Sequence, residues 1–367
     1  MDFRVQILKD IEQFVPFYIS LQEKGARLLR IPTVLFPIVF NLLWIGLAIA
    51  IVAATENLDP FINFWLRVNF SAALAGAMYF MPLAHARLMA IMDRVLYMTA
   101  TEEDAIVVRD CVRNMLVSKW QTIYCAFMAV VTACSGIYLG MPLGPVSQTI
   151  LVLSAILVGV VAASGLWFTF SFFYMVIRIS KFSDVRLNVF EPTTSIGIKE
   201  LVNFSMAWGI IFLLESCLVI FGVLMPPWTN GGDLLFWISF AWVGSIVVLL
   251  MLNFFLPGYF LTNLLRFSKN TITSNLQERI NAIYKKIILA PEDQEDVRKH
   301  IALINDYQNL YLNVRRSNSS PIDYRVVVKF LASTVVPILI FVFKNPSQIA
   351  SFLEMVVNFI SRFQHGG

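Results

Sequence analysis

Six apolar segments, each at or above the length of a membrane crossing, alternate with polar segments along the chain. A transmembrane helix needs about 20 mainly apolar residues. The six segments cover about residues 32–54, 66–92, 121–140, 148–180, 202–225 and 236–267. This pattern predicts an all-α fold: a polytopic α-helical integral membrane protein with six to seven transmembrane helices, in which residues 32–267 form a six-helix transmembrane domain.

The sixth apolar segment passes into the polar and basic segment 268–288 without a strong helix breaker. We therefore expect one continuous or once-kinked helix that leaves the membrane and forms a stalk. Pro257 and Gly258 mark the position of the expected kink. Proline removes one helical hydrogen bond and clashes with the preceding turn, so it bends or breaks a helix interior.

The segment before the first span is amphipathic. Residues 1–31 carry apolar side chains at helical spacing, such as Ile7 and Ile11, opposite charged ones. The pattern predicts an N-terminal helix that lies in the cytoplasm or at the membrane interface, against lipid or a partner helix. We expect Pro16 and Gly25 to interrupt it.

Residues 268–323 show two amphipathic stripes and predict a cytoplasmic helical hairpin. Pro291 and the acids that follow it are typical of a helix start. The second stripe consists of Leu303, Tyr307, Leu310 and Val314. Two interpretations stay open: a folded cytoplasmic cap, or a stalk for oligomerisation or for docking a cytoplasmic protein partner.

Two arrangements of the tail, residues 324–367, are physically possible. Its apolar part, 326–343, is barely long enough for a seventh span and is followed by Asn345 and Pro346. It either crosses the bilayer and leaves an amphipathic helix outside, or forms a re-entrant hairpin that returns the C-terminus to the cytoplasm. A seventh crossing is the preferred interpretation.

The distribution of Lys and Arg predicts the orientation. The N-terminal segment and residues 93–119, 180–200 and 266–329 are rich in both, whereas 55–66, 141–147 and 226–234 contain none. By the positive-inside rule the N-terminus and the stalk are cytoplasmic. The short loops and the lack of a signal peptide suggest a bacterial inner membrane.

Composition supports the same class and excludes others. The chain is 58% hydrophobic and 14% charged, with a mean hydropathy of +0.71, against about 25% charged residues in soluble domains. A net charge of only +4 does not indicate a nucleic-acid-binding surface. The four cysteines lack CxxC spacing and the three histidines are dispersed. We find no catalytic motif and expect no enzyme activity, cofactor or metal.

Polar groups inside the spans are the remaining candidates for a pathway or gate. Glu215 lies near the middle of span five, where a carboxylate is costly and must be protonated, paired or hydrated. It is either a functional site or a neutral acid bonded to a neighbouring helix. His85 could gate by titration, or simply bond a carbonyl. Lys329 is an interfacial anchor or, alternatively, part of a charge ring at a pore mouth.

Asn253 precedes Pro257 and Gly258, and this combination predicts a hinge with exposed backbone carbonyls in the sixth span. Other intramembrane asparagines are more simply hydrogen-bonding contacts between helices. Arg67, beside Trp65, has the pattern of an anchor at the outer interface.

Three function classes follow. The first is a homo-oligomeric channel that passes ions or small solutes, with the sixth span and stalk as the moving element. The second is a secondary transporter that uses Glu215 as its coupling site. The third is a non-conducting scaffold or receptor whose hairpin docks a partner.

In span count and orientation the arrangement resembles the insect chemoreceptor type of tetrameric channel, where the last span lines the pore. The long segment 268–323 departs from that family, and its final-span signature is absent here. The resemblance therefore implies no site residue.

Overall fold

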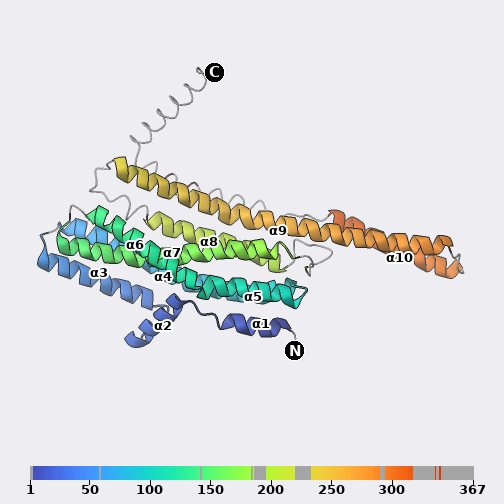
Figure 1. The fold of residues 1–367 in the computed structure, drawn as a ribbon, viewed down its shortest axis with the longest axis horizontal. Coiled ribbons are helices and arrows are strands. Elements are labelled where there is room, and N and C mark those ends of the chain that lie inside the picture. The colour runs from blue at the N-terminus through green and yellow to red at the C-terminus, as the bar shows by residue number, and fades with distance from the viewer. Residues whose placement is uncertain are drawn as a thin grey trace, which may run out of the picture.

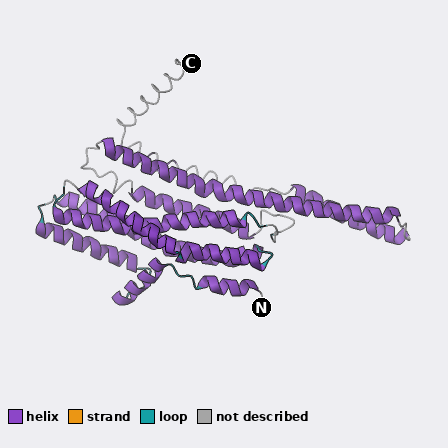
Figure 2. Cartoon of the chain, viewed as in Figure 1, coloured by secondary structure: helices purple, strands orange, loops and turns teal. Residues whose placement is uncertain are grey.

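The computed structural model describes residues 3–57, 59–140, 143–182, 185, 196–219, 233–289, 294–316, 335 and 339. Helix is the only regular secondary structure in these ranges, apart from one isolated bridge between Thr99 and Val185 (Figure 2). In chain order the described helices are α1 (Phe3–Glu12), α2 (Phe17–Leu29), α3 (Phe36–Thr55), α4 (Pro60–Met98), α5 (Glu102–Val117), α6 (Lys119–Gly140), α7 (Pro145–Ile179), α8 (Ile196–Val219), α9 (Asp233–Leu289) and α10 (Gln294–Arg316).

The prediction of an all-α membrane protein is confirmed at the level of class. Within the described ranges, five helical segments are long and apolar enough to cross a membrane: Phe36–Thr55, Phe70–Met98, Glu102–Ile137, Pro145–Ile179 and Val247–Ile288. Each of them overlaps one of the first four predicted spans or the sixth. The predicted fifth span, 202–225, lies on α8 as far as Val219, and its last residues are outside the described ranges. The tail 324–367 is also outside them, except for Val335 and Leu339.

Helix α3 sets the level of the bilayer. Its 20 residues span about 30 Å, which matches the thickness of the hydrocarbon core. Helices α4 and α7 have 39 and 35 residues and are therefore about 58 and 52 Å long. Part of each lies beside α3, where the Trp44 indole donates to Ser154 Oγ at 3.0 Å. The rest extends past the start of α3 towards α1 and α5 (Figure 1).

The largest buried core lies in this extension and not beside α3. It joins α1, the second halves of α4 and α7, α5, the first half of α8 and part of α9. By contrast, α3 exposes Ile38, Leu42, Leu43, Leu47 and Ile51. Apolar side chains in lipid have no water to avoid, whereas those in water must be buried. The burial pattern thus indicates that the part of the bundle beside α3 is surrounded by lipid and that the extension is surrounded by water.

Close packing of α6 on α7 depends on small residues. A Cβ atom at Gly159 of α7 would lie 2.7 Å from Thr132 Cγ2 of α6. The missing side chain lets the two backbones approach, as is common between membrane helices.

The N-terminal segment forms two helices. Pro16 separates them, as expected, but Gly25 lies within α2 and does not interrupt it, so that expectation is wrong. A single glycine costs a helix only about 1 kcal/mol, which packing can offset. Ile7 and Ile11 are buried in the main core, so α1 packs against other helices of the chain.

The first part of α9 packs along the bundle, whereas its last part, about residues 268–289, and α10 form an antiparallel arm that extends away from it (Figure 1). Helix α9 continues through Pro257 for 57 residues. Helix α10 packs against α9, and Leu276 and Ile280 of α9 and Ile304 and Val314 of α10 are buried. Leu303, which we assigned to the α10 stripe, is exposed instead. The adjacent Ile304 is buried in its place, whereas Tyr307, Leu310 and Val314 are partly or fully buried as predicted.

Candidate functional site

Asn253 lies on α9 at its contact with α8. Its side chain is 2% exposed, and neither its amide nitrogen nor its oxygen has a hydrogen-bond partner within the described part of the chain. Its backbone carbonyl oxygen accepts a hydrogen bond of 2.5 Å from Ser205 Oγ of α8. The residue is 20 positions after the first residue of α9, so about 30 Å of helix precedes it. One bilayer core therefore separates Asn253 from the beginning of α9.

Pro257 explains why the Asn253 carbonyl needs a partner from another helix. In a regular helix the N–H of residue 257 would bond the carbonyl of residue 253, but proline has no N–H. Ser205 replaces the missing donor. Serine side chains of neighbouring helices commonly compensate prolines in membrane helices in this way. The Asn253 carbonyl that Pro257 leaves without a helical donor is therefore bonded to α8 and is not exposed.

The remaining residue of the predicted hinge is Gly258, which is buried beside Pro257. Its carbonyl oxygen accepts a hydrogen bond of 2.6 Å from Thr262 Oγ1, one turn further along α9. Side chains therefore bond backbone carbonyls on both sides of the proline: Ser205 bonds that of Asn253, and Thr262 bonds that of Gly258.

A second polar contact lies next to the first. The indole N–H of Trp208 on α8 donates to Thr169 Oγ1 on α7 at 2.7 Å, and all these groups are buried. The Trp208 ring packs on Phe168 with a centroid separation of 4.9 Å. Together, Thr169, Trp208, Ser205 and Asn253 form a polar seam through α7, α8 and α9. Aromatic side chains of α7 and α8 pack on one another beside this seam.

The same proline relation recurs in α4. Pro82 leaves the carbonyl of Met78 without its helical donor. The side-chain amide of Gln22 on α2 donates to that carbonyl at 2.9 Å. Sequence reasoning identified neither Gln22 nor Ser205. Counting back four residues from a proline gives the acceptor, whereas the donor comes from a distant segment.

The structure does not bring the other predicted site residues to the seam. His85 on α4 is half-buried, and its Nε2 lies 3.4 Å from the carbonyl oxygen of Phe14, between α1 and α2. This position fits the interpretation of a histidine that bonds a carbonyl. Glu215 lies on α8, two turns beyond Trp208, and its side chain is outside the described set. Lys329 lies outside the described residues altogether.

Arg67 differs most from its expected place. It is 2% exposed instead of facing the interface. Its Nη2 donates to Ser147 Oγ at 2.7 Å and its Nε to Asn63 Oδ1 at 3.3 Å, while Nη1 has no partner among the described atoms. Glu56 attracts it electrostatically. A buried arginine is tolerated at this depth because several acceptors converge on it.

The Glu56 carboxylate has a second role. It accepts hydrogen bonds from the backbone N–H groups of Val146 and Ser147 at 2.7 and 3.2 Å. These groups lie in the first turn of α7, where a negative charge is favourable. The hydrogen bonds of Glu56 and Arg67 therefore join the end of α3 and the first part of α4 to the start of α7.

Among the residues that the structure describes, no three acids, cysteines or histidines lie close enough to hold a metal ion. Comparison with protein-family models, with curated proteins and with solved structures finds no match to this chain. The resemblance to insect chemoreceptor channels thus stays one of predicted span count and orientation.

Proposed function

We propose that this chain is the subunit of a homo-oligomeric membrane channel that passes ions or small solutes, without enzymatic activity. In this proposal α9 is the moving element, and its membrane portion lines the pathway. The N-terminus and the arm lie in the cytoplasm, as the distribution of basic residues predicts.

The continuity of α9 is the observation that carries the proposal. One helix of 57 residues includes both a membrane segment and the arm. A displacement of the arm therefore moves the membrane segment, because a helix transmits tilt along its axis. The proposed hinge at Pro257 lies within the membrane segment, one turn after Asn253, whose side-chain amide has no partner among the described residues. A buried amide without a partner costs about 1–3 kcal/mol, and in this proposal a second arrangement of α9 relieves that cost.

The exposed face of α9 supports an oligomer. Its large exposed apolar side chains include Val248, Phe255 and Tyr259. Phe267, about 21 Å beyond Asn253 along α9, is 54% exposed as well. Phe267 is the last residue of the predicted sixth span, 236–267, and in this proposal α9 of a second copy covers it.

Disulfide cross-linking tests this interface. With Cys134 changed to Ser, Phe267→Cys should give covalent dimers in membranes, because symmetry places the same face on both subunits. Leu42→Cys is a matched control, since Leu42 is 62% exposed on the lipid-facing side of α3. Cross-links at Leu42 but not at Phe267 would contradict the proposed interface.

A non-conducting scaffold is the second candidate, and one feature of the arm favours it. Ile288 is 74% exposed, and Tyr284, Ile301 and Leu312 are exposed as well, all on α10 or on the part of α9 that follows the predicted sixth span, 236–267. Exposed apolar patches outside the membrane mark interaction surfaces. If Ile288→Ser abolishes capture of a cytoplasmic protein by the full chain, and reconstituted membranes stay electrically silent, the scaffold replaces the channel.

A further inference from the structure

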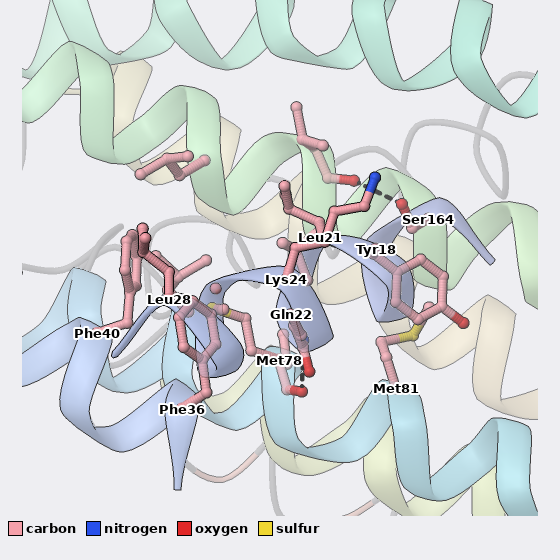
Figure 3. A pocket seen from close by; sticks show the side chains of 16 residues that line it. Tyr18, Leu21, Gln22, Lys24, Leu28, Phe36, Phe40, Met78, Met81 and Ser164 are labelled. Carbon is pink, nitrogen blue, oxygen red and sulfur yellow. Dashed lines mark hydrogen bonds between the residues drawn. The ribbon is translucent and has the colours of Figure 1, made fainter. Parts of the chain in front are cut away.

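An apolar pocket of about 480 Å³ lies between α2 and the membrane helices α3, α4 and α7 (Figure 3). Its walls include Leu28 of α2, Phe36 and Phe40 of α3, Met81 of α4 and Leu157 of α7. Its volume is within the range of roughly 300–1,000 Å³ that is typical of ligand sites. The pocket is thus large enough for a ligand and suited to an apolar one.

The wall that α2 provides is held by two specific contacts. The Gln22 amide donates to the Met78 carbonyl, which Pro82 leaves without a helical donor. Gly25 lies against the ring of Phe36 so closely that a Cβ atom would clash with it. These contacts fix the distance between α2 and the bundle. The pocket is therefore a built cavity and not a chance gap beneath a loose helix.

The polar groups in the wall carry no charge. The Gln22 amide is bonded to the backbone, as Figure 3 shows. Burial raises the pKa of Tyr18 above its usual range, so its phenol stays neutral. Ser164 donates its hydroxyl proton to the Val160 carbonyl at 3.0 Å. The part of a ligand that enters the pocket must accordingly be apolar.

The rim of the pocket is positively charged. Lys24 is the charged residue among the lining side chains; it is exposed and forms no ion pair with any described residue. Arg27 and Arg30 follow on α2 and at its C-cap, whereas Glu23 is the acid of this helix and does not line the pocket. The site therefore combines an apolar interior with a cationic edge.

The position of the pocket matches the headgroup level of one leaflet. Phe36 is the first residue of α3, the helix whose length equals the bilayer core. Leu21 and Leu28, which are exposed on α2 beside the pocket, would lie in the interfacial layer of that leaflet. A lipid in this leaflet has its anionic group at the level of Lys24 and its chains at the level of the cavity.

We infer that the pocket holds one acyl chain of an anionic phospholipid of the adjacent leaflet, and that Lys24 binds the lipid phosphate. The assignment uses charge complementarity at the rim and the apolar interior, and it does not depend on the channel proposal. Because Gln22 links the wall of the pocket to the proline site of α4, the bound lipid stabilises the docked position of α2.

Lipid binding to the full-length protein tests the inference. Delipidated protein is titrated with phosphatidylglycerol and with phosphatidylcholine of identical chains, and native mass spectrometry counts the bound molecules. We expect one tightly bound phosphatidylglycerol, preferred about fivefold over phosphatidylcholine, as one surface cation provides. Equal binding of the two lipids would contradict the role of Lys24. Tighter binding of oleate than of phosphatidylglycerol would contradict a phospholipid as the occupant.

Two variants with matched controls locate the site. Ala77→Phe fills the cavity from α4 and should remove the tightly bound lipid, whereas Ala126→Phe, on the exposed face of α6, should not. Lys24→Gln should abolish the preference for phosphatidylglycerol over phosphatidylcholine, while Lys285→Gln on the arm should retain it. Unchanged binding in folded Ala77→Phe would overturn the inference.

A measurement on the unmodified chain covers the case in which Ala77→Phe fails to fold. Phosphatidylglycerol with a photoreactive diazirine in one chain is cross-linked to the wild-type protein, and the labelled peptides are identified. We expect labelling to concentrate on α2 and on the segments of α4 and α7 that line the pocket. Labelling spread evenly over the outer faces of α3 and α6 would show ordinary boundary lipid and contradict the pocket.

Discussion

The hydroxyl of Ser205 donates a 2.5 Å hydrogen bond to the carbonyl oxygen of Asn253, the carbonyl that Pro257 leaves without a helical donor. The amide of Gln22 stands in the same relation to Met78 and Pro82. In each case a side chain of a neighbouring helix satisfies a backbone group that would otherwise be costly in lipid. These two bonds hold α8 to α9 and α2 to α4.

Ser205→Ala should lower the free energy of unfolding by about 1–3 kcal/mol, because it leaves the buried Asn253 carbonyl without a donor. Unfolding in detergent micelles measures this change. Ser135→Ala is the control: Ser135 is exposed and bonds the Val131 carbonyl of its own helix, so its loss should stay within about 0.5 kcal/mol. Equal losses for both variants would show that the bond to Asn253 has no special weight.

Gln22→Leu should release α2 from the bundle, because the Met78 carbonyl loses its donor. Hydrogen exchange followed by mass spectrometry should show faster exchange of α2 amides, while α3 keeps its protection. Gln6→Leu, at an exposed position of α1, serves as the control. If α2 exchanges at the wild-type rate in Gln22→Leu, other contacts dock this helix.

Asn253→Leu and Asn41→Leu should change stability in opposite directions, although both asparagines are buried. The Asn253 side chain has no described partner, so leucine removes an unsatisfied amide and should stabilise the protein by about 1–3 kcal/mol. The Asn41 amide donates to the Pro37 carbonyl at 2.7 Å, so its replacement should destabilise. In the channel proposal, Asn253→Leu also makes the opening and closing of the pathway less frequent. Destabilisation by both substitutions would mean that Asn253 has a partner outside the described residues.

Glu56→Gln should destabilise the protein by about 1.5–3 kcal/mol, the range for hydrogen bonds to charged groups. It removes the negative charge from the start of α7 and from the surroundings of buried Arg67. Thermal unfolding compares it with Glu102→Gln, an exposed acid in the first turn of α5. A similar small loss in both variants would contradict a structural role for the Arg67 network.

The membrane helices could be predicted from the sequence to within a few residues where the chain is apolar on all sides. The first span was expected at 32–54 and is Phe36–Thr55, and the fourth was expected at 148–180 and is Pro145–Ile179. Run length alone sets such boundaries in lipid. The second span continues to Met98 and not to Met92, because its last turns are amphipathic and bury Val95 in the water-side core.

The candidate site was predictable only in its local part. Pro257 identifies the Asn253 carbonyl as an acceptor, because that relation depends on a spacing of four residues. The donor, Ser205, lies 48 positions away in the chain, and no local pattern indicates it. Arg67 has the same difficulty: beside Trp65 it has the pattern of an anchor, but its partner Ser147 lies 80 positions away.

Recording of currents from purified protein in planar lipid bilayers tests whether the chain forms a channel. We expect discrete current steps from the wild-type protein. In Pro257→Ala the step size should be unchanged and the open times altered, because alanine restores the helical bond to Asn253 and stiffens α9 at the hinge. Membranes that contain intact, folded protein and stay electrically silent under all ionic conditions would contradict the channel proposal.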